Sequence, residues 1–281
     1  MKCMNTLLYS PNHVSLIYIF TDFTNWAWYR PGVGKYRPED IDPTICTHVV
    51  YGFAVLDSNN LIIKPHDSWA DLDNQFYKKV TSLKKYGIKV TVAIGGWNDS
   101  LGGKYSKLVN NPAARAKFVS HVVEFVEKHG FDGLGMYACI FFKKKYIYVL
   151  VVSNDFFVNK YIFYPLDLDW EYPKCWQVDC SKGPASDKEA FALWVSELKA
   201  AFEPKGLLLS AAVSPSKKVM DAGYDIPSIA RDLDWIAVMT YDYHGHWDKK
   251  TGHVAPMYAH PEDDYDYFNT VSEIFFSLQK W

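Results

Sequence analysis

The feature of this sequence that most constrains its fold is a series of short, nearly continuous apolar runs separated by amphipathic stretches. Apolar runs without polar alternation are typical of strands buried on both faces, as in a parallel sheet covered by helices. The pattern therefore predicts an α/β fold. The runs are "VSLIYIFTDF" (14–23), "THVVYGFA" (47–54), "IKVTVAIG" (88–95), "LLLSAAV" (207–213) and "WIAVMTY" (235–241).

Three of the stretches between these runs carry helix signals. Residues 72–86 place apolar side chains on one stripe and end before a glycine. Residues 112–129 begin with a proline after Asn111, a favoured N-cap residue. Residues 187–202 follow Ser186, which would begin a capping box. Helices between apolar strands predict β–α–β crossovers.

The segment "DLDWE" combines an apolar strand with acidic side chains. In a strand, Asp167, Asp169 and Glu171 would share one face, and Leu168 and Trp170 the other. Carboxylates about 7 Å apart on a buried strand raise at least one pKa, which leaves a neutral acid able to donate a proton. Glu171 is the best donor because it comes last, where β/α barrels bind substrate. A solvated strand end and a divalent-cation site are the alternatives.

The start of the same strand lies far upstream, as "FDGL" (131–134). Counting it together with residues 167–171 gives six strands, spaced by roughly 40 residues, whereas a closed eight-stranded β/α barrel needs about 250 residues or more. The chain of 281 residues stops after the sixth strand. Because we find no internal repeat and no low-complexity linker, we expect one domain.

Composition narrows the classes of partner. A net charge of −2 gives no electrostatic reason to expect nucleic acid or an anionic membrane. Aromatic residues make up 17% of the chain, and one use of many flat rings is sugar binding. The N-terminus is a poor signal peptide because polar residues break its apolar stretch. No run of 18 apolar residues exists, so no transmembrane helix is expected.

The five cysteines cannot all pair within the chain. Cys175 and Cys180 bracket a short loop and either form a local disulfide or stay free. A zinc site is disfavoured because no second Cys or His pair has ligand spacing. We therefore expect no metal and no cofactor. The sequon "NDS" (98–100) is a weak three-residue signal for glycosylation, and we expect it to be unused.

Joined together, the two pieces read "FDGLDLDWEYP", which is the signature of glycoside hydrolase family 18, the chitinases and chitinase-like proteins. The chain resembles this family over about 23–134 and 166–270, and most closely its arthropod-type secreted chitinases. Further segments that resemble the family's strands one, two, three and six are "FTNWAWYRPG" (23–32), "CTHVVYGFA" (46–54), "IGGW" (94–97) and "MTYDYHGHW" (239–247).

The resemblance implies a (β/α)8 TIM barrel of the chitinase type, truncated after about strand 6 and interrupted within strand 4. It also implies endo-type, substrate-assisted, retaining hydrolysis of β-1,4-linked N-acetylglucosamine polymers. Glu171 would protonate the glycosidic oxygen, and the sugar's own N-acetyl carbonyl would attack the anomeric carbon. Asp169 would hold the acetamido N–H, and Asp167 would tune Asp169 electrostatically.

Other roles follow from the same resemblance. Tyr241 and Asp242 would orient the acetamido group, and Met239 would line the pocket. The rings of Trp26, Trp97 and Trp247 would stack on sugars. The partner would be chitin or chitooligosaccharides, with no nucleic acid and no membrane. The protein would be an extracellular monomer.

The chain departs from the family in three places. Residues 135–166 interrupt the signature, and we interpret them as a translated intron in an incomplete gene model. Residues 271–281 are interpreted as a non-family tail, which leaves a partial catalytic domain over 14–270. At the start, Asp22 replaces a family tyrosine and Cys46 loses its disulfide partner. We expect the insertion to loop out from the buried strand that it interrupts, and the chain to fold poorly and show little activity.

Two other hypotheses stay open. One is a chitinase-like lectin that binds chitin without cutting it, and the other is an inactive fragment of a chitinase. Lectin-like members typically lack the acidic glutamate, so the presence of Glu171 favours the enzyme.

Overall fold

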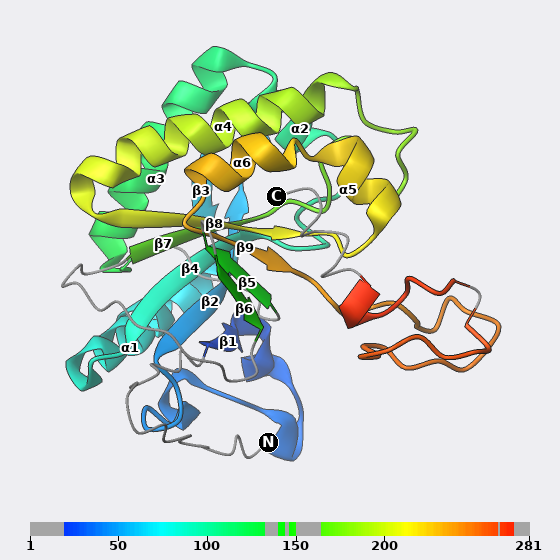
Figure 1. Cartoon of the computed structure of the whole chain (residues 1–281). Helices are drawn as coiled ribbons and strands as arrows, with labels where there is room; N and C mark the ends of the chain where they lie inside the picture. Colours follow the sequence, from blue (N-terminus) through cyan, green and yellow to red (C-terminus); the bar gives the residue numbers. More distant parts are fainter. Residues whose placement is uncertain (1–19, 133–139, 144–145, 150–163, 264, 273–281) are drawn as a thin grey trace, which may run out of the picture.

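The computed structural model describes residues 20–132, 140–143, 146–149, 164–263 and 265–272. These residues form one nine-stranded sheet in the order β1-β2-β4-β7-β8-β9-β5-β6, with β3 paired to β2 outside this path. Figure 1 shows the sheet running through the molecule, with α2 to α6 gathered on one side and α1 lying beside β2 and β4.

Six of the strands are parallel and are neighbours in chain order, as in a β/α barrel that has been opened. Five predicted strands are present, although residues 14–19 of the first lie outside the described part of the chain. The predicted fourth strand, 131–134 joined to 167–171, is present only in its second half, because β7 ends at Asp169 and neither Phe131 nor Asp132 belongs to a strand; residues 133–134 lie outside the described part. The parallel strands are β1 (Phe20–Thr24), β2 (His48–Leu56), β4 (Lys89–Gly95), β7 (Tyr164–Asp169), β8 (Leu207–Val213) and β9 (Trp235–Val238).

Three short antiparallel strands complete the sheet. β3 (Ile63–Pro65) pairs with β2. β5 (Ile140–Lys143) and β6 (Tyr146–Val149) form a hairpin, and β5 pairs with β9. Part of the segment 135–166 therefore returns to the sheet at a different edge, because β9 offers backbone groups with which β5 pairs. Its last residues also belong to a strand, since β7 begins at Tyr164.

The observed helix bounds agree best with the predicted ones where the sequence carries clear capping residues. The helix predicted over 112–129 is α3 (Pro112–His129), and the Asn111 side chain caps it by accepting the N–H groups of Ala113 and Ala114. The helix predicted after Ser186 is α4 (Ser186–Phe202). The predicted capping box is wrong, because the helix begins one residue earlier and Ser186 is its first helical residue.

The single helix predicted over 72–86 is wrong. This stretch consists of a π-helical turn (Trp69–Asp73), α1 (Phe76–Thr81) and a 3-10 turn (Ser82–Tyr86), and it ends at Gly87 as predicted. The remaining helices are α2 (Lys104–Val109), α5 (Lys217–Gly223) and α6 (Ile226–Asp232). Further 3-10 turns are Asn25–Tyr29, Gly32–Gly34, Pro38–Asp40 and Glu203–Lys205.

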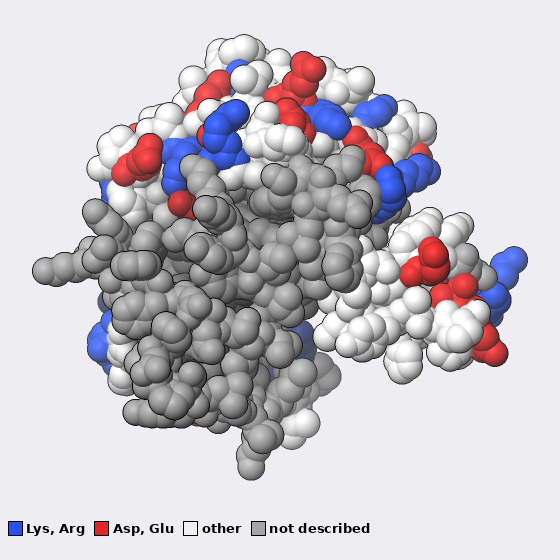
Figure 2. Space-filling view, viewed as in Figure 1, with Lys and Arg blue, Asp and Glu red and all other residues white. Residues whose placement is uncertain are grey.

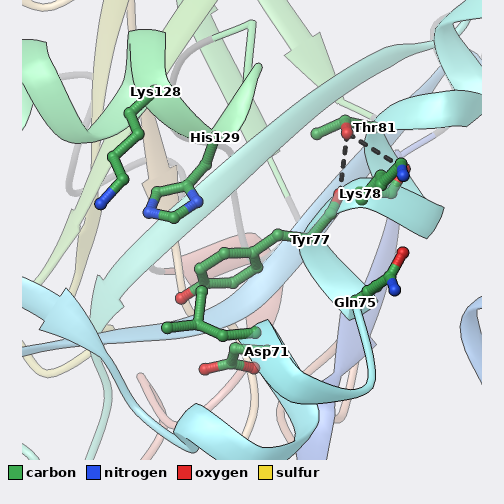
Figure 3. A pocket seen from close by; sticks show the side chains of 8 residues that line it. Asp71, Gln75, Tyr77, Lys78, Thr81, Lys128 and His129 are labelled. Carbon is green, nitrogen blue, oxygen red and sulfur yellow. Dashed lines mark hydrogen bonds between the residues drawn. The ribbon is translucent and has the colours of Figure 1, made fainter.

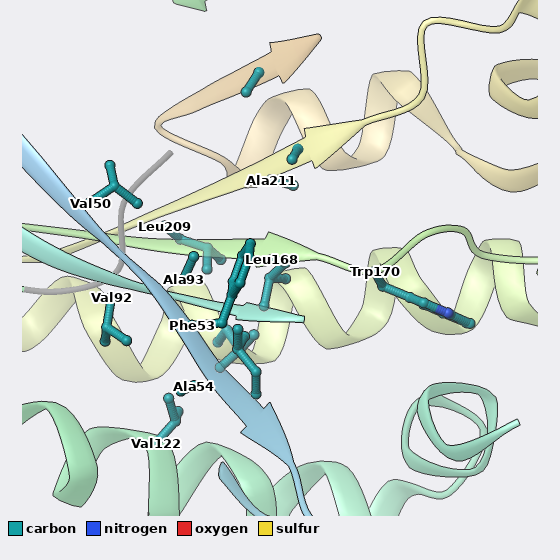
Figure 4. Close-up of a cluster of buried hydrophobic side chains, with 14 of the residues drawn as sticks. Val50, Phe53, Ala54, Val92, Ala93, Val122, Leu168, Trp170, Leu209 and Ala211 are labelled. Carbon is teal, nitrogen blue, oxygen red and sulfur yellow. The ribbon is translucent and has the colours of Figure 1, made fainter. Parts of the chain in front are cut away.

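The core between the sheet and the helices contains the two apolar side chains of the segment "DLDWE". Leu168 and Trp170 are each 1% exposed; Figure 4 shows Leu168 among the apolar side chains of the neighbouring strands, and Trp170 apart from them beyond the strand end. The Trp170 ring stacks on Tyr105 of α2 with centroids 5.7 Å apart and meets Phe191 of α4 at 6.1 Å. Because side chains alternate along a strand, the carboxylates on either side of Leu168 and Trp170 face the other way.

Candidate active site

Three carboxylates cluster at the C-terminal end of β7. Asp167 is fully buried and Asp169 is 3% exposed. Strand register places Asp167 beside Ser210 of β8, whose hydroxyl donates to Asp167 Oδ1 at 3.0 Å. Burial holds the pKa of Asp167 well above its usual value. Burial does the same to the pKa of Asp169, and the charges of Glu171 and Asp167 raise it further.

Glu171 has the pKa that general acid catalysis at neutral pH requires. Burial raises its pKa to about 7, against a hydrogen bond from Tyr172 that lowers it, and the charge of Asp242 raises it further. Buried carboxyls commonly show such shifts, because a low-dielectric environment disfavours the charged form. The expected pKa increase in the acidic cluster is therefore present.

The loop after β4 holds the backbone around Glu171. The Asp169 carbonyl oxygen accepts the Gly96 N–H at 2.9 Å and the Ser100 hydroxyl at 3.4 Å. The Glu171 N–H donates to the same Ser100 hydroxyl at 2.9 Å. A side chain on Gly95, which has a φ of 119°, would collide with the Asp169 carbonyl. The glycines of "IGGW" therefore allow two strand ends to approach closely.

The end of β9 lies on the far side of β8 from β7. Met239 is buried, and its N–H donates to the Val213 carbonyl at 3.0 Å, which extends the pairing with β8. Tyr241 is half-buried and Asp242 is exposed. Asp242 has a left-handed φ of 57°, and its charge acts on Glu171. The structure thus brings Asp242 toward the acidic cluster.

The three rings predicted to stack on sugars follow strand ends and are exposed. Trp26 follows β1 and is 39% exposed, and it stacks on Phe53 at 5.9 Å between centroids. Trp97 follows β4 and is 46% exposed. Trp247 is 58% exposed and belongs to the segment after β9, which Figure 1 shows extending away from the strand ends. Only Trp26 and Trp97 therefore come from segments close to the sheet.

Comparison with known proteins agrees with this architecture. Residues 19–140 and 142–278 match the sequence family described as glycosyl hydrolases family 18. The chain belongs to glycosyl hydrolases family 18. Its fold is the chitinase-type α/β barrel, of which the described residues contain six parallel strands in an open arrangement. The predicted domain limits at 14 and 270 stay a prediction.

The relatives of this family 18 chain include insect chitinases. It is 55% identical over 258 residues, 92% of the chain, to "Probable chitinase 10" of Drosophila melanogaster, of which it spans only 10%. Among solved structures, catalytic domain 2 of the Ostrinia furnacalis Group II chitinase is 52% identical with a TM-score of 0.81, over 94% of this chain and 61% of that one. Human YKL-39, described as a pseudo-chitinase with retained chitooligosaccharide binding, is 27% identical with a TM-score of 0.71, over 94% and 63%.

Several residues near the acidic cluster were not predicted as part of the site. Asp22 on β1 was predicted only as a departure from the family, yet its charge acts on both Asp167 and Asp169. Ser100 belongs to the weak glycosylation sequon, but it is fully buried and its hydroxyl binds the backbone around Glu171. Only contacts between distant segments reveal these roles, so no local sequence signal could have found them.

The two open cysteine alternatives are resolved. Cys175 and Cys180 form a disulfide, and Cys46 is a buried free cysteine, whereas Cys3 and Cys139 lie outside the described residues. Within the described part of the chain, no group of three His, Cys, Asp or Glu side chains could hold a metal ion. No helix among the residues described is long and apolar enough to cross a membrane.

A cavity of about 330 Å³ lies elsewhere, between α1 and the C-terminal end of α3. Figure 3 shows Tyr77 and His129 side by side in it; Asp71, which also lines it, accepts the Asn25 amide at 3.0 Å. The bond from Asn25 to Asp71 joins the 3-10 turn after β1 to the π-helical turn before α1. Figure 2 shows Lys and Arg interspersed with Asp and Glu over the described helical face, without a patch of one sign.

Proposed function

We propose that this site hydrolyses β-1,4-linked N-acetylglucosamine polymers, with Glu171 as the general acid and base. One observation carries the proposal: Glu171 lies two residues beyond the end of the buried strand β7, and its pKa is raised to about 7. A carboxyl with that pKa is partly protonated at neutral pH and can give its proton to a leaving oxygen. A solvated strand end would leave the pKa of Glu171 near its ordinary value.

The reaction is substrate-assisted. Glu171 protonates the glycosidic oxygen while the acetamido carbonyl oxygen of the same sugar attacks the anomeric carbon, so that the bond to the leaving sugar breaks. Water then attacks the anomeric carbon and gives a proton to the Glu171 carboxylate, which restores the acetamido group and the catalyst. The anomeric configuration is retained without a protein nucleophile, as is known for this exception to the two-carboxylate scheme.

The other carboxylates serve the acetamido group. Asp169, whose carboxyl lies within reach of the charge of Glu171, accepts the acetamido N–H and thereby orients the attacking carbonyl. Asp167 is fully buried beside Ser210 and keeps its proton more readily than a solvated carboxyl, because burial raises its pKa. Its protonation state controls how much negative charge Asp169 carries. Tyr241 and Asp242 complete the acetamido pocket above Met239.

The exposed rings of Trp26, Trp97 and Trp247 provide stacking surfaces for pyranose rings. Chitin and chitooligosaccharides are therefore the proposed partners, and a solved relative of this family was crystallised with penta-N-acetylchitooctaose. We further propose endo-type cleavage by an extracellular monomer that binds neither nucleic acid nor membranes, in keeping with the insect chitinases among its relatives.

The test is turnover of a soluble chitooligosaccharide by the full chain and by a variant that lacks residues 135–166, each with and without Glu171→Gln. We expect Glu171→Gln to lower kcat by roughly 10²- to 10⁴-fold, the usual contribution of a general acid, and to leave binding measured by calorimetry intact. Turnover that survives the substitution would sink the assignment of Glu171.

The second candidate, a chitin-binding lectin, is favoured by one observation, the similarity to the pseudo-chitinase YKL-39. In the same experiment, the lectin would be supported if the full chain and the variant lacking residues 135–166, both with Glu171 intact, bind the oligosaccharide without turnover. If these two chains show neither binding nor turnover, the protein is an inactive fragment.

A further inference from the structure

A loop closed by the Cys175–Cys180 disulfide follows Glu171 directly in the chain. Gln177 lies inside this loop in the left-handed conformation, with a φ of 51°. A non-glycine residue in that region is uncommon and needs surrounding structure to hold it. Closing a loop of this size with a disulfide supplies such a constraint. The backbone N–H of Gln177 donates back to the Glu171 carbonyl at 3.3 Å.

The Gln177 side chain reaches a second loop. Its amide Nε2 donates to the backbone carbonyl of Trp97 at 3.0 Å. Trp97 follows β4, and its ring is one of the exposed aromatic surfaces near the strand ends. Gln177 therefore contacts the main chain of both Glu171 and Trp97, two residues 74 positions apart in the sequence.

The same second loop also binds the backbone N–H of Glu171. Ser100 accepts the Glu171 N–H at 2.9 Å and donates to the Asp169 carbonyl at 3.4 Å. Both backbone hydrogen-bonding groups of Glu171 are thus bound, the N–H by the loop after β4 and the carbonyl by the disulfide loop. Gln177 joins these two loops through a side-chain hydrogen bond.

We infer that Gln177 is a positioning residue that holds the exposed Trp97 ring at a set place relative to Glu171. It touches neither the substrate nor the reacting atoms, and it acts through the main chain of the two residues that do. A sugar stacked on Trp97 is then held in register with the proton donor. The inference rests on the proposed function for its consequence in catalysis, but the link between the loops can be measured without activity.

The first test compares Gln177→Met with Val178→Met. Methionine keeps the length of glutamine and removes its amide donor. Val178 is a matched control because it lies in the same loop, has a left-handed φ of 61° and is 52% exposed. We expect Gln177→Met to lower kcat/KM on a chitooligosaccharide about 3- to 10-fold, the effect of one neutral hydrogen bond, mostly in kcat. Val178→Met should stay within about twofold, as surface substitutions do.

The second test is backbone hydrogen exchange followed by mass spectrometry on peptides that cover 94–103 and 167–174. Exchange in both peptides should be faster in Gln177→Met than in Val178→Met, with no change over 112–129. Equal exchange in the two variants would overturn the inference, whatever the hydrolysis assay shows. If exchange differs between the two variants as expected but the wild type turns over no substrate, the proposed function fails and the coupling of the loops stands.

Discussion

Asp132 and Val90 exchange two hydrogen bonds. The Asp132 N–H donates to the Val90 carbonyl at 2.7 Å, and the Val90 N–H donates to Asp132 Oδ2 at 3.0 Å. Three residues further along β4, Ala93 pairs with Asp167. Removing residues 135–166 would place Asp167 three residues after Asp132. Asp132 and Asp167 thus lie along β4 with the spacing that the two halves of one interrupted strand would have.

This register predicts that a variant lacking residues 135–166 folds better and is more active than the full chain. Closing a loop of that length costs roughly 3 kcal/mol of chain entropy, and the deletion would remove this cost. It would also remove the β5–β6 hairpin, which covers the edge of β9. We expect a higher Tm and a higher kcat on chitooligosaccharides. A lower Tm with unchanged kcat would show that the segment is an integral part of the fold.

The raised pKa of Glu171 predicts the alkaline limb of the pH–rate profile. A general acid must be protonated to work, so kcat/KM should fall as the pH rises through about 7, the pKa of Glu171. Beyond that point the decrease should approach tenfold per pH unit. Initial rates measured from pH 5 to pH 9 test this. A flat profile up to pH 9 would exclude Glu171 as the titrating group.

Asp22 predicts an effect on stability that does not depend on turnover. Its charge raises the pKa values of the buried Asp167 and Asp169. A carboxyl whose pKa is raised in the folded state stabilises the protein below its unfolded pKa, and this stability is lost as the pH rises through the folded pKa. Asp22→Asn should lower the pKa values of Asp167 and Asp169 in the folded state. The protein should then lose less stability as the pH rises.

The measurement is the difference in Tm between pH 5 and pH 8. In Asp22→Asn we expect this difference to shrink by about 2–4 °C, which corresponds to roughly 1 kcal/mol in a chain of this size. Asp73→Asn, at an exposed aspartate, is the control and should change nothing. The same Tm difference in wild type and Asp22→Asn would show that the charge of Asp22 does not act on the acidic cluster.

The close contact at Gly95 predicts that substitution of this glycine strongly destabilises the fold. Alanine there would need a φ of 119° and would drive its Cβ into the Asp169 carbonyl. We expect Gly95→Ala to destabilise the fold by roughly 2–4 kcal/mol and to reduce turnover by moving the end of β7. Gly87→Ala is the matched control, because Gly87 has a φ of 82° with no atom within 4 Å of the added Cβ. Similar denaturant midpoints for the two variants would contradict the role of the close contact.

Local patterns predicted the elements that local interactions decide. The bounds of α3 follow from Asn111, Pro112 and Gly130, which cap or begin the helix. The segment over 72–86 failed, because a left-handed φ at Gln75 interrupts it and no residue type there signals that break. The hairpin of β5 and β6 was missed because its place depends on the free edge of β9, which is nearly a hundred residues away in the sequence.

The sequence by itself determined the carboxylate alternation of "DLDWE" and the family to which it belongs, since both depend only on residue types and spacing. Only the tertiary structure showed that burial and the neighbouring charge of Asp242 raise the pKa of Glu171 to about 7. It likewise decided that Ser100 and Gln177 hold the backbone of Glu171 from two separate loops. Such contacts join residues that lie far apart along the chain, and packing alone brings them together.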